Sequence, residues 1–184
     1  VALVLAACST PESESTTEGE TTAAGEETEA EAPAEGDSGP LHIGTLLPVT
    51  GSLSQLGPPE IAGVDLAVAE INEAGGIFGA DVEVTHTDSS DTENAAVATE
   101  SSQKLISEGV QAIIGAASSG VTFNVIDDIT GAGIVQVSGA NTATDLSGYS
   151  DFYFRTAPPD TVQGDALANL MISDGAANVA AIVF

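Results

Sequence analysis

The chain is strongly acidic: its 184 residues include 28 Asp and Glu against 2 Lys and Arg, which gives a formal net charge of −26 at pH 7. A surface this negative repels phosphate backbones, so nucleic acid is excluded as a partner, because such binding depends on Lys and Arg. Hydrophobic residues make up 42% of the chain and aromatic residues only 4%, so a core must be built mainly from Ala, Val, Ile and Leu. A single cysteine excludes an intrachain disulfide.

The first eight residues, VALVLAAC, have the pattern of a bacterial lipoprotein signal. Residues 1–7 are apolar and far shorter than the roughly 20 residues that span a bilayer, which favours the end of a signal-peptide core. Residues 5–8, LAAC, resemble a lipobox, whose cysteine becomes the mature N-terminus and carries a diacylglyceryl group. The alternative is an incidental cysteine. We interpret residues 1–8 as a signal-peptide remnant and lipobox, which predicts an extracytoplasmic protein, lipid-anchored to the bacterial cell membrane through Cys8.

Residues 9–39 have the composition of a disordered acidic linker. They hold ten acidic residues and no aromatic or large aliphatic residue, so they cannot bury enough apolar surface to offset the entropy of ordering. We therefore expect a flexible tether between the anchor and the folded part. The chain begins with Val rather than Met and stops inside the apolar run 179–184, so we expect a fragment of a longer protein.

From residue 41 onward, short apolar runs alternate with helical patterns. Helices are expected from Pro58 to a stop at Gly75 and Gly76, and over 92–108, 119–131 and 161–173, the last with Leu167, Leu170 and Met171 facing inward. Strands are expected at 43–47, 82–84, 110–114, 134–137 and 152–154, and from 179 onward. Such alternation indicates βαβ units, so the fold class is α/β, a Rossmann-like parallel sheet with helices on both faces.

Three loops after the first, third and fourth predicted strands share a small, hydroxyl-rich and uncharged character: residues 50–55, 116–120 and 138–144. Ligands of parallel sheets bind beyond the carboxyl ends of the strands. Ser118 and Ser119 stand where a helix begins, and its free N–H groups suit a carboxylate. The alternative for these two serines is ordinary helix capping.

Signatures of enzymes and nucleotide binders are missing from the sequence. There is no glycine-rich phosphate loop and no nucleophile elbow. His42 and His86 lie on or beside strands without partners at metal-ligand spacing, so a structural or surface role is expected for both. We expect no catalytic residue, no metal and no cofactor.

Residues 43–79, IGTLLPVTGSLSQLGPPEIAGVDLAVAEINEAGGIFG, resemble the opening of the branched-chain amino-acid-binding proteins. These are periplasmic-binding-protein type I receptors that deliver Leu, Ile, Val and related ligands to ABC importers. The family pattern is a strand, T/S-G, a loop ending in Gly, and a helix closing on I-N-x-x-G-G-I-x-G. The resemblance continues through Asp88, QKLI at 103–106, IIG at 113–115, and FRT at 154–156, and so covers 41–184.

The resemblance implies roles for residues of the three loops. Ser119 would hold the ligand's carboxylate, the carbonyl of Ala140 would accept from its ammonium, and the Thr142 hydroxyl would touch both ends. Leu56 stands where relatives often place an aromatic that covers the ligand, which leaves the side-chain preference open. The ligand-binding residues expected from the resemblance and the loop pattern are Ser118, Ser119, Ala140, Asn141, Thr142 and Leu56.

The resemblance also implies a domain organisation and partners. Lobe one would span 41–156 and be nearly complete, and 157–184 would form the hinge and only begin lobe two. The ligand would be a branched-chain or similar small amino acid, captured by clamshell closure, and ABC permease subunits would be the protein partners. The alternatives are the same fold binding short amides, urea, aromatic acids or another small polar solute, or a sensor that does not transport.

Overall fold

The structure is a computed structural model of the chain, and it describes residues 39–181. These residues belong to one compact unit, Asp37–Phe184. The predictions for the lipobox with Cys8 and for nearly all of the linker at 9–39 lie outside the described residues, as does the end of the chain at 182–184.

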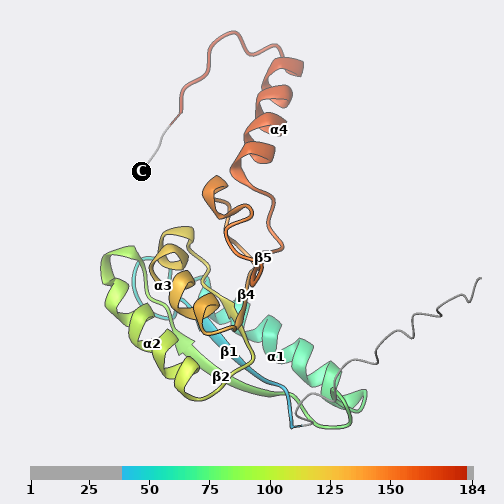
Figure 1. Cartoon of the computed structure of the whole chain (residues 1–184). Coiled ribbons are helices and arrows are strands. Elements are labelled where there is room, and N and C mark those ends of the chain that lie inside the picture. Colours follow the sequence, from blue (N-terminus) through green and yellow to red (C-terminus); the bar gives the residue numbers. More distant parts are fainter. Residues whose placement is uncertain (1–38, 182–184) are drawn as a thin grey trace, which may run out of the picture. The chain divides into compact units, whose positions relative to one another are not determined.

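A five-stranded parallel sheet forms the centre of the described fold (Figure 1). Its order is β2-β1-β3-β4-β5, and every pair of neighbours is parallel. The strands are β1 (His42–Leu47), β2 (Glu83–Asp88), β3 (Ala112–Gly115), β4 (Val135–Ser138) and β5 (Tyr153–Arg155). The predicted α/β class with a parallel sheet is confirmed.

Helices lie between the strands, as βαβ units require, and one further helix follows β5. They are α1 (Gly57–Glu73), the short 3-10 helix η1 (Thr92–Asn94), α2 (Ala95–Ser107), α3 (Ser119–Gly131), the 3-10 helix η2 (Thr144–Leu146) and α4 (Asp160–Ser173). Proline in the first turn starts α1. Gly75, with φ of 106°, follows its C-cap in a conformation that other residues rarely adopt.

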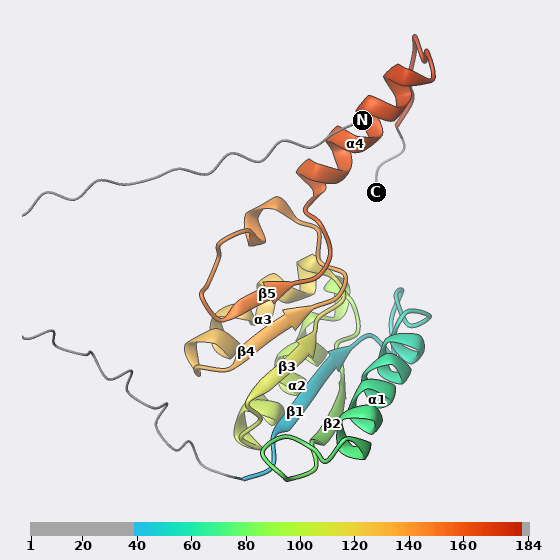
Figure 2. The same cartoon turned by 90° about the vertical axis from the view of Figure 1, so that its right-hand side faces the viewer.

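Helices α2 and α3 lie on one face of the sheet (Figure 2), which we call the α2/α3 face. This face carries the dense hydrophobic core. Leu46 of β1 and Ile113 of β3 are fully buried there, together with Leu105 of α2 and Ile129 of α3. Gly44 lets α2 approach β1 closely, because a Cβ at that position would stand 2.8 Å from the Leu105 methyl carbons.

The opposite face, the α1 face, is covered only in part. A groove of about 460 Å³ runs along it between α1 and the sheet, and we call it the α1 groove. Its lining is mostly apolar and includes Leu41, Ile43, Leu47, Val64, Val68, Ile71 and Ile114. The strand register pairs Ile114 with Val137 and Val137 with Phe154, so these residues continue the α1 face across β4 and β5. The Phe154 residue is 54% exposed, so this part of the face is not covered. The predicted cover of helices on both faces is therefore confirmed but uneven.

Several predicted boundaries move by a few residues. The strand expected at 82–84 corresponds to β2, which is longer than predicted. Its sequence, EVTHTD, is too polar to indicate a buried strand over its full length. The helix expected at 92–108 is divided into η1 and α2 at Asn94, whose φ of −113° and ψ of 38° are not helical. The Asp91 side chain accepts from the Asn94 N–H and caps η1. The helix expected at 119–131 matches α3.

The predicted burial of α4 is wrong for the described residues. Leu167 and Leu170 are 52% and 57% exposed, and α4 has no buried residue. The physical reason is that no element of the described part packs on this helix closely enough to bury a side chain. The strand predicted from 179 is not formed at 179–181, and its remainder lies outside the described residues.

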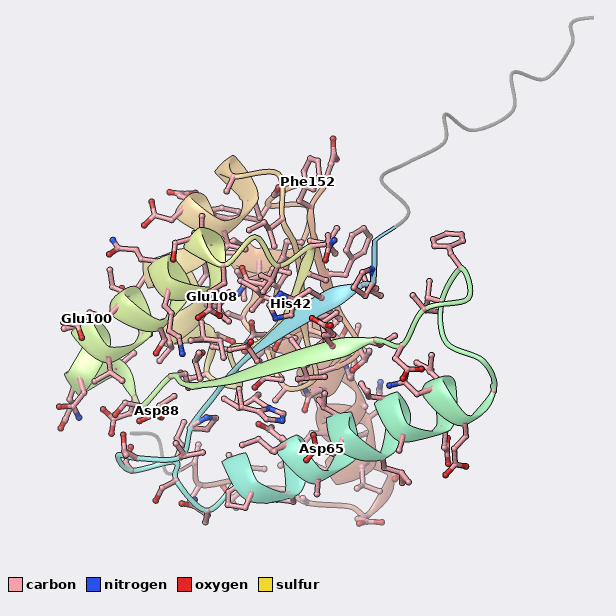
Figure 3. All side chains as sticks on the ribbon, turned by 90° about the horizontal axis from the view of Figure 1, so that it is seen from below. His42, Asp65, Asp88, Glu100, Glu108 and Phe152 are labelled. Carbon is pink, nitrogen blue, oxygen red and sulfur yellow. The ribbon has the colours of Figure 1, made fainter. Side chains whose placement is uncertain are left out.

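Both histidines join neighbouring elements. The His86 ring bonds with the Thr45 hydroxyl through Nδ1 and with the Asp65 carboxylate of α1 through Nε2, each at 2.9 Å. Figure 3 shows Asp65 on the side of α1 that faces the sheet. The His42 ring bonds with the Thr85 hydroxyl across β1 and β2 at 2.9 Å. These contacts confirm the structural role predicted for both rings.

Candidate ligand-binding site

The candidate site lies at the carboxyl ends of β1, β3 and β4. The strand order reverses between β1 and β3, and in open parallel sheets ligands bind in the crevice outside the strand ends at such a point. The loops in question are residues 48–56, which we call the first loop, and residues 116–118 and 139–143.

The start of α3 presents an unpartnered helix terminus. Ser118 is the N-cap residue, with φ of −81° and ψ of 130°, and its side chain makes no capping hydrogen bond. The first backbone bond of the helix is donated by the Thr122 N–H to the Ser118 carbonyl. The N–H groups of the preceding turn, residues 119–121, have no protein acceptor among the described residues. This end of α3 carries partial positive charge and suits an anion.

Ser119 connects this helix terminus to the loop after β4. Its Oγ accepts hydrogen bonds from the N–H of Thr142 at 3.1 Å and of Ala143 at 3.2 Å. A hydroxyl has two lone pairs and one hydrogen, so only the hydrogen of Ser119 remains for a further partner. The side chain can then act only as a donor, which requires an acceptor such as a carboxylate oxygen. Side-chain capping was the alternative role for the two serines. The Ser118 side chain makes no capping hydrogen bond, and the Ser119 side chain bonds to the loop after β4 instead.

The loop after β4 carries two polar oxygen atoms, the Thr142 hydroxyl and the Ala140 carbonyl. The Thr142 backbone is held at both ends: its N–H bonds to Ser119, and its carbonyl accepts from the Asp160 N–H at 2.8 Å. Its hydroxyl and the carbonyl of the exposed Ala140 have no hydrogen-bond partner among residues 39–181. Both unpaired acceptors belong to the loop whose Thr142 N–H bonds to Ser119 at the start of α3.

Asn141 occupies a different position from its neighbours in the sequence. It is fully buried, and its side-chain amide bonds to Ala116, Ala117, Thr122 and Tyr153. An amide has two donor hydrogens and two acceptor lone pairs, so these four bonds leave no capacity for a ligand. The structure places five of the six predicted residues at accessible positions, and Asn141 behind them.

The first loop is held by two carboxylates, Asp88 at the end of β2 and Asp91 just after it. Asp88 accepts from the N–H groups of Val49 at 2.9 Å and Thr50 at 3.2 Å, and Asp91 accepts from the Ser52 N–H at 2.7 Å. Figure 3 shows Asp88 at the end of β2, next to the loop that leads into α1. Gly51, with φ of 77°, has no room for a Cβ because Asp91 packs directly against it.

These hydrogen bonds change the acidity of both carboxyls. The bond from the Ser52 N–H, followed by that from Asn94, lowers the pKa of Asp91 to about 2. Burial alone would raise the pKa of Asp88, but the bonds from Thr50, Ser90 and Val49 outweigh it and lower the pKa. Both groups are ionised at neutral pH. The sequence pattern did not single out Asp91, although its spacing of three residues to Asn94 is typical of a helix cap.

Leu56 lies at the N-cap of α1, and its residue is 40% exposed. Among the described residues no hydrogen bond joins the first loop to Ser119 or Thr142. The connection is indirect, since Asp91 holds Ser52 and the Thr92 methyl group packs against Gly120 in the first turn of α3. The role of Leu56 over a ligand stays a prediction.

The α1 groove is a separate feature. Of the loops described above, only Ala117 and Gly139 contribute to its lining. Its apolar walls offer few polar groups for orienting a small polar solute. Within residues 39–181, no group of three His, Cys, Asp or Glu is arranged to hold a metal ion.

Comparison with known proteins agrees with this fold. The family model described as periplasmic binding protein matches residues 40–183. The leucine-, isoleucine-, valine-, threonine- and alanine-binding protein of Pseudomonas aeruginosa is 32% identical over 120 residues, which cover 64% of this chain and 31% of that protein. The Leu/Ile/Val-binding protein of Escherichia coli is 31% identical over 126 residues, 67% of this chain and 34% of that protein.

Among solved structures, the branched-chain amino-acid transporter substrate-binding protein LivJ of Streptococcus pneumoniae, in complex with isoleucine, superposes with a TM-score of 0.66 at 34% identity. The match covers 72% of this chain and 38% of LivJ. The chain belongs to the periplasmic binding protein family, and the resemblance to its branched-chain amino-acid branch is confirmed. It spans about a third of the length of these relatives. No helix within 39–181 is both long and apolar enough to cross a membrane.

Proposed function

We propose that the chain forms the first lobe of an extracytoplasmic receptor that captures a branched-chain or similar small amino acid and delivers it to an ABC importer. The observation that carries this proposal is the geometry of Ser119. Its lone pairs are both occupied by backbone N–H groups, so its hydroxyl donates outward beside the free N-terminus of α3. A carboxylate is the group that this pair of features binds best.

The ammonium of an amino acid needs acceptors next to that carboxylate site. The Ala140 carbonyl and the Thr142 hydroxyl are available there without competing partners in the described part of the chain. The site therefore has donors for the anion and acceptors for the cation of one zwitterion. The names of the relatives, and the isoleucine in the LivJ complex, support the same ligand class.

The first lobe by itself should bind weakly. Hydrogen bonds to charged groups contribute about 1.5–3 kcal/mol each, and association costs about 4–15 kcal/mol. Micromolar binding requires about 8 kcal/mol net. We therefore propose that residues 41–156 form lobe one, that 157–184 begin the hinge and lobe two, and that a closed clamshell is needed for tight binding. Closure would shift a pre-existing equilibrium through contacts that both lobes make.

The N-terminal residues would place this receptor at a membrane. Cys8, as the lipidated first residue, and the acidic stretch 9–39, as a tether, would hold the lobe near permease subunits. Metabolic labelling with an alkyne fatty acid tests the anchor in a bacterial lipoprotein-processing host that expresses the chain behind a complete signal peptide. Labelling that is lost in Cys8→Ala supports the anchor, and labelling that persists in this variant contradicts it.

The ligand proposal is tested by thermal unfolding of the chain with millimolar L-leucine, L-isoleucine and L-valine, and in parallel with acetamide, urea and benzoate. Amino acids should raise the midpoint most. Ser119→Ala should raise the dissociation constant about tenfold or more, because one charged hydrogen bond is lost, and Thr142→Ala should also weaken binding. Ser107→Ala, at an exposed hydroxyl on α2, is the matched control. A larger response to acetamide, urea or benzoate would overturn the assignment of the ligand.

A further inference from the structure

The side chain of Asn141 has a complete set of hydrogen bonds inside the protein. Its Oδ1 accepts from the Thr122 hydroxyl at 2.7 Å and from the Tyr153 hydroxyl at 2.8 Å. Its Nδ2 donates to the carbonyls of Ala116 at 3.0 Å and Ala117 at 2.9 Å. Carbonyls accept only, so the nitrogen must face them and the orientation of the amide is fixed.

These four bonds join four separate segments of the fold. Asn141 belongs to the loop after β4, the two carbonyls to the loop after β3, Thr122 to α3 and Tyr153 to β5. Ser138 adds to the connection, because its hydroxyl donates to the Ala116 carbonyl at 2.8 Å and accepts from the Asn141 N–H at 3.1 Å. One buried side chain thus ties together both loops that carry the candidate ligand groups.

We propose that Asn141 is the positioning residue of the ligand site: together with the bond from the Thr142 N–H to Ser119 Oγ, it holds the loop that leads to Ser119 against the loop that carries Thr142. The proposal rests on the proposed function for the identity of the ligand, but the ordering of the two loops does not depend on it. A binding site tolerates displacements of only about 0.5 Å in its groups, so loosening of either loop separates the carboxylate donor from the ammonium acceptors.

Replacement of Asn141 by Asp keeps the shape and changes the chemistry. The carboxylate would face two carbonyl oxygens that it repels, and burial would raise its pKa. Protonation restores one donor, so the loops should tighten again as the pH falls. The other titratable group in contact is Tyr153, whose own pKa is raised by burial, so it stays neutral throughout. Arg155, two residues further along β5, donates a hydrogen bond to the Ala143 carbonyl.

The experiment compares amide hydrogen exchange at residues 116–122 and 138–143 in the ligand-free chain, at neutral and mildly acidic pH. Asn141→Asp should raise exchange at least tenfold at neutral pH and recover part of the protection in acid. Asn141→Leu should raise exchange without the pH dependence. Asn124→Asp, at an exposed position of α3, is the matched control and should change neither quantity. Wild-type protection in Asn141→Asp at both pH values would overturn the proposal.

Two milder variants keep the proposal testable if both Asn141 variants fail to fold. Thr122→Val and Tyr153→Phe each remove one bond to Oδ1, and each should raise exchange in both loops by a smaller factor. Unchanged exchange in both would overturn the proposal. L-leucine titration of the same samples separates the two hypotheses. If the variants loosen the loops and also weaken leucine binding, both the positioning role of Asn141 and the proposed function are supported. If the variants loosen the loops but the wild-type chain binds no amino acid, only the proposed function is overturned.

Discussion

The two faces of the sheet bury the same kinds of side chain to very different extents. On the α2/α3 face, Ile129 of α3 is fully buried, whereas on the α1 face Ile71 of α1 remains 37% exposed beside the groove. Burial of apolar surface yields about 25 cal/mol per Å², so the α2/α3 face contributes most of the stability of the described unit. The candidate ligand loops after β3 and β4 bond to α3 or lead into it, and so depend on that better-packed face.

The largest expected difference between the faces comes from a matched pair of truncations. Ile129→Ala should lower the free energy of unfolding by about 2–5 kcal/mol, because it opens a cavity in a closed core. Ile71→Ala should cost about 1 kcal/mol or less, since its side chain already contacts solvent. Urea denaturation measures both. Equal losses would show that the α1 groove is closed in solution.

A second pair concerns two glycines. Gly44→Ala should destabilise the chain by about 1–3 kcal/mol, because the added methyl group meets the buried Leu105 side chain. Gly63→Ala, within α1, meets nothing within 4 Å and should stabilise by about 0.5–1 kcal/mol through helix propensity. In thermal unfolding, the midpoint should fall for Gly44→Ala and rise for Gly63→Ala. A destabilising Gly63→Ala would mean that the α1 face is more tightly packed than described.

Two carboxyls should respond to pH in opposite directions. Asp91 has a folded pKa of about 2, below its ordinary 3.8, so it stabilises the fold above about pH 3.8, and this stabilisation is lost as the pH falls through 2. Asp91→Asn should therefore lower the unfolding midpoint at neutral pH and lose its effect in strong acid. Unequal midpoints at the acid limit would point to a cause other than the charge.

The pKa of Glu60, in the α1 groove, is shifted in the opposite direction to that of Asp91. Desolvation raises its pKa above 4.5, and one carboxyl oxygen is buried without a partner. Its ionisation therefore costs stability as the pH rises through the folded pKa. Glu60→Gln should raise the unfolding midpoint slightly at neutral pH and not below about pH 4. A lower midpoint at neutral pH would contradict this.

Most of the fold could be predicted because its boundaries coincide with strong local signals. Pro58 and Gly75 mark the two ends of α1, and α3 follows its apolar spacing. Strand β2 was predicted too short because His86 and its neighbours are polar. The hydrogen bonds that the His86 ring makes come from side chains of other elements, which the local sequence does not reveal. The exposure of α4 could not be read from its apolar residues, because burial depends on which element packs against a helix.

The site was less predictable than the fold. The loops could be selected because they follow neighbouring parallel strands, but the choice of Ser119, Ala140 and Thr142 within them came from the resemblance to the branched-chain amino-acid-binding proteins. Asn141 was selected with them, and nothing local distinguishes it. Its burial results from four partners that lie 12 to 25 residues away in sequence. The Asp91 contact with the first loop is equally nonlocal, at a separation of 39 residues.

The central claim is that the free N-terminus of α3 and the Ser119 hydroxyl bind the carboxylate of an amino acid. The most direct test is an amide chemical-shift titration of the chain with L-leucine and, separately, with L-leucinamide, which keeps the ammonium and side chain but lacks the carboxylate. L-leucine should shift the amides of Ser119, Gly120 and Val121 with a millimolar dissociation constant, and L-leucinamide should bind about tenfold more weakly or worse. Equal shifts by both compounds, or shifts confined to the α1 groove, would contradict the account.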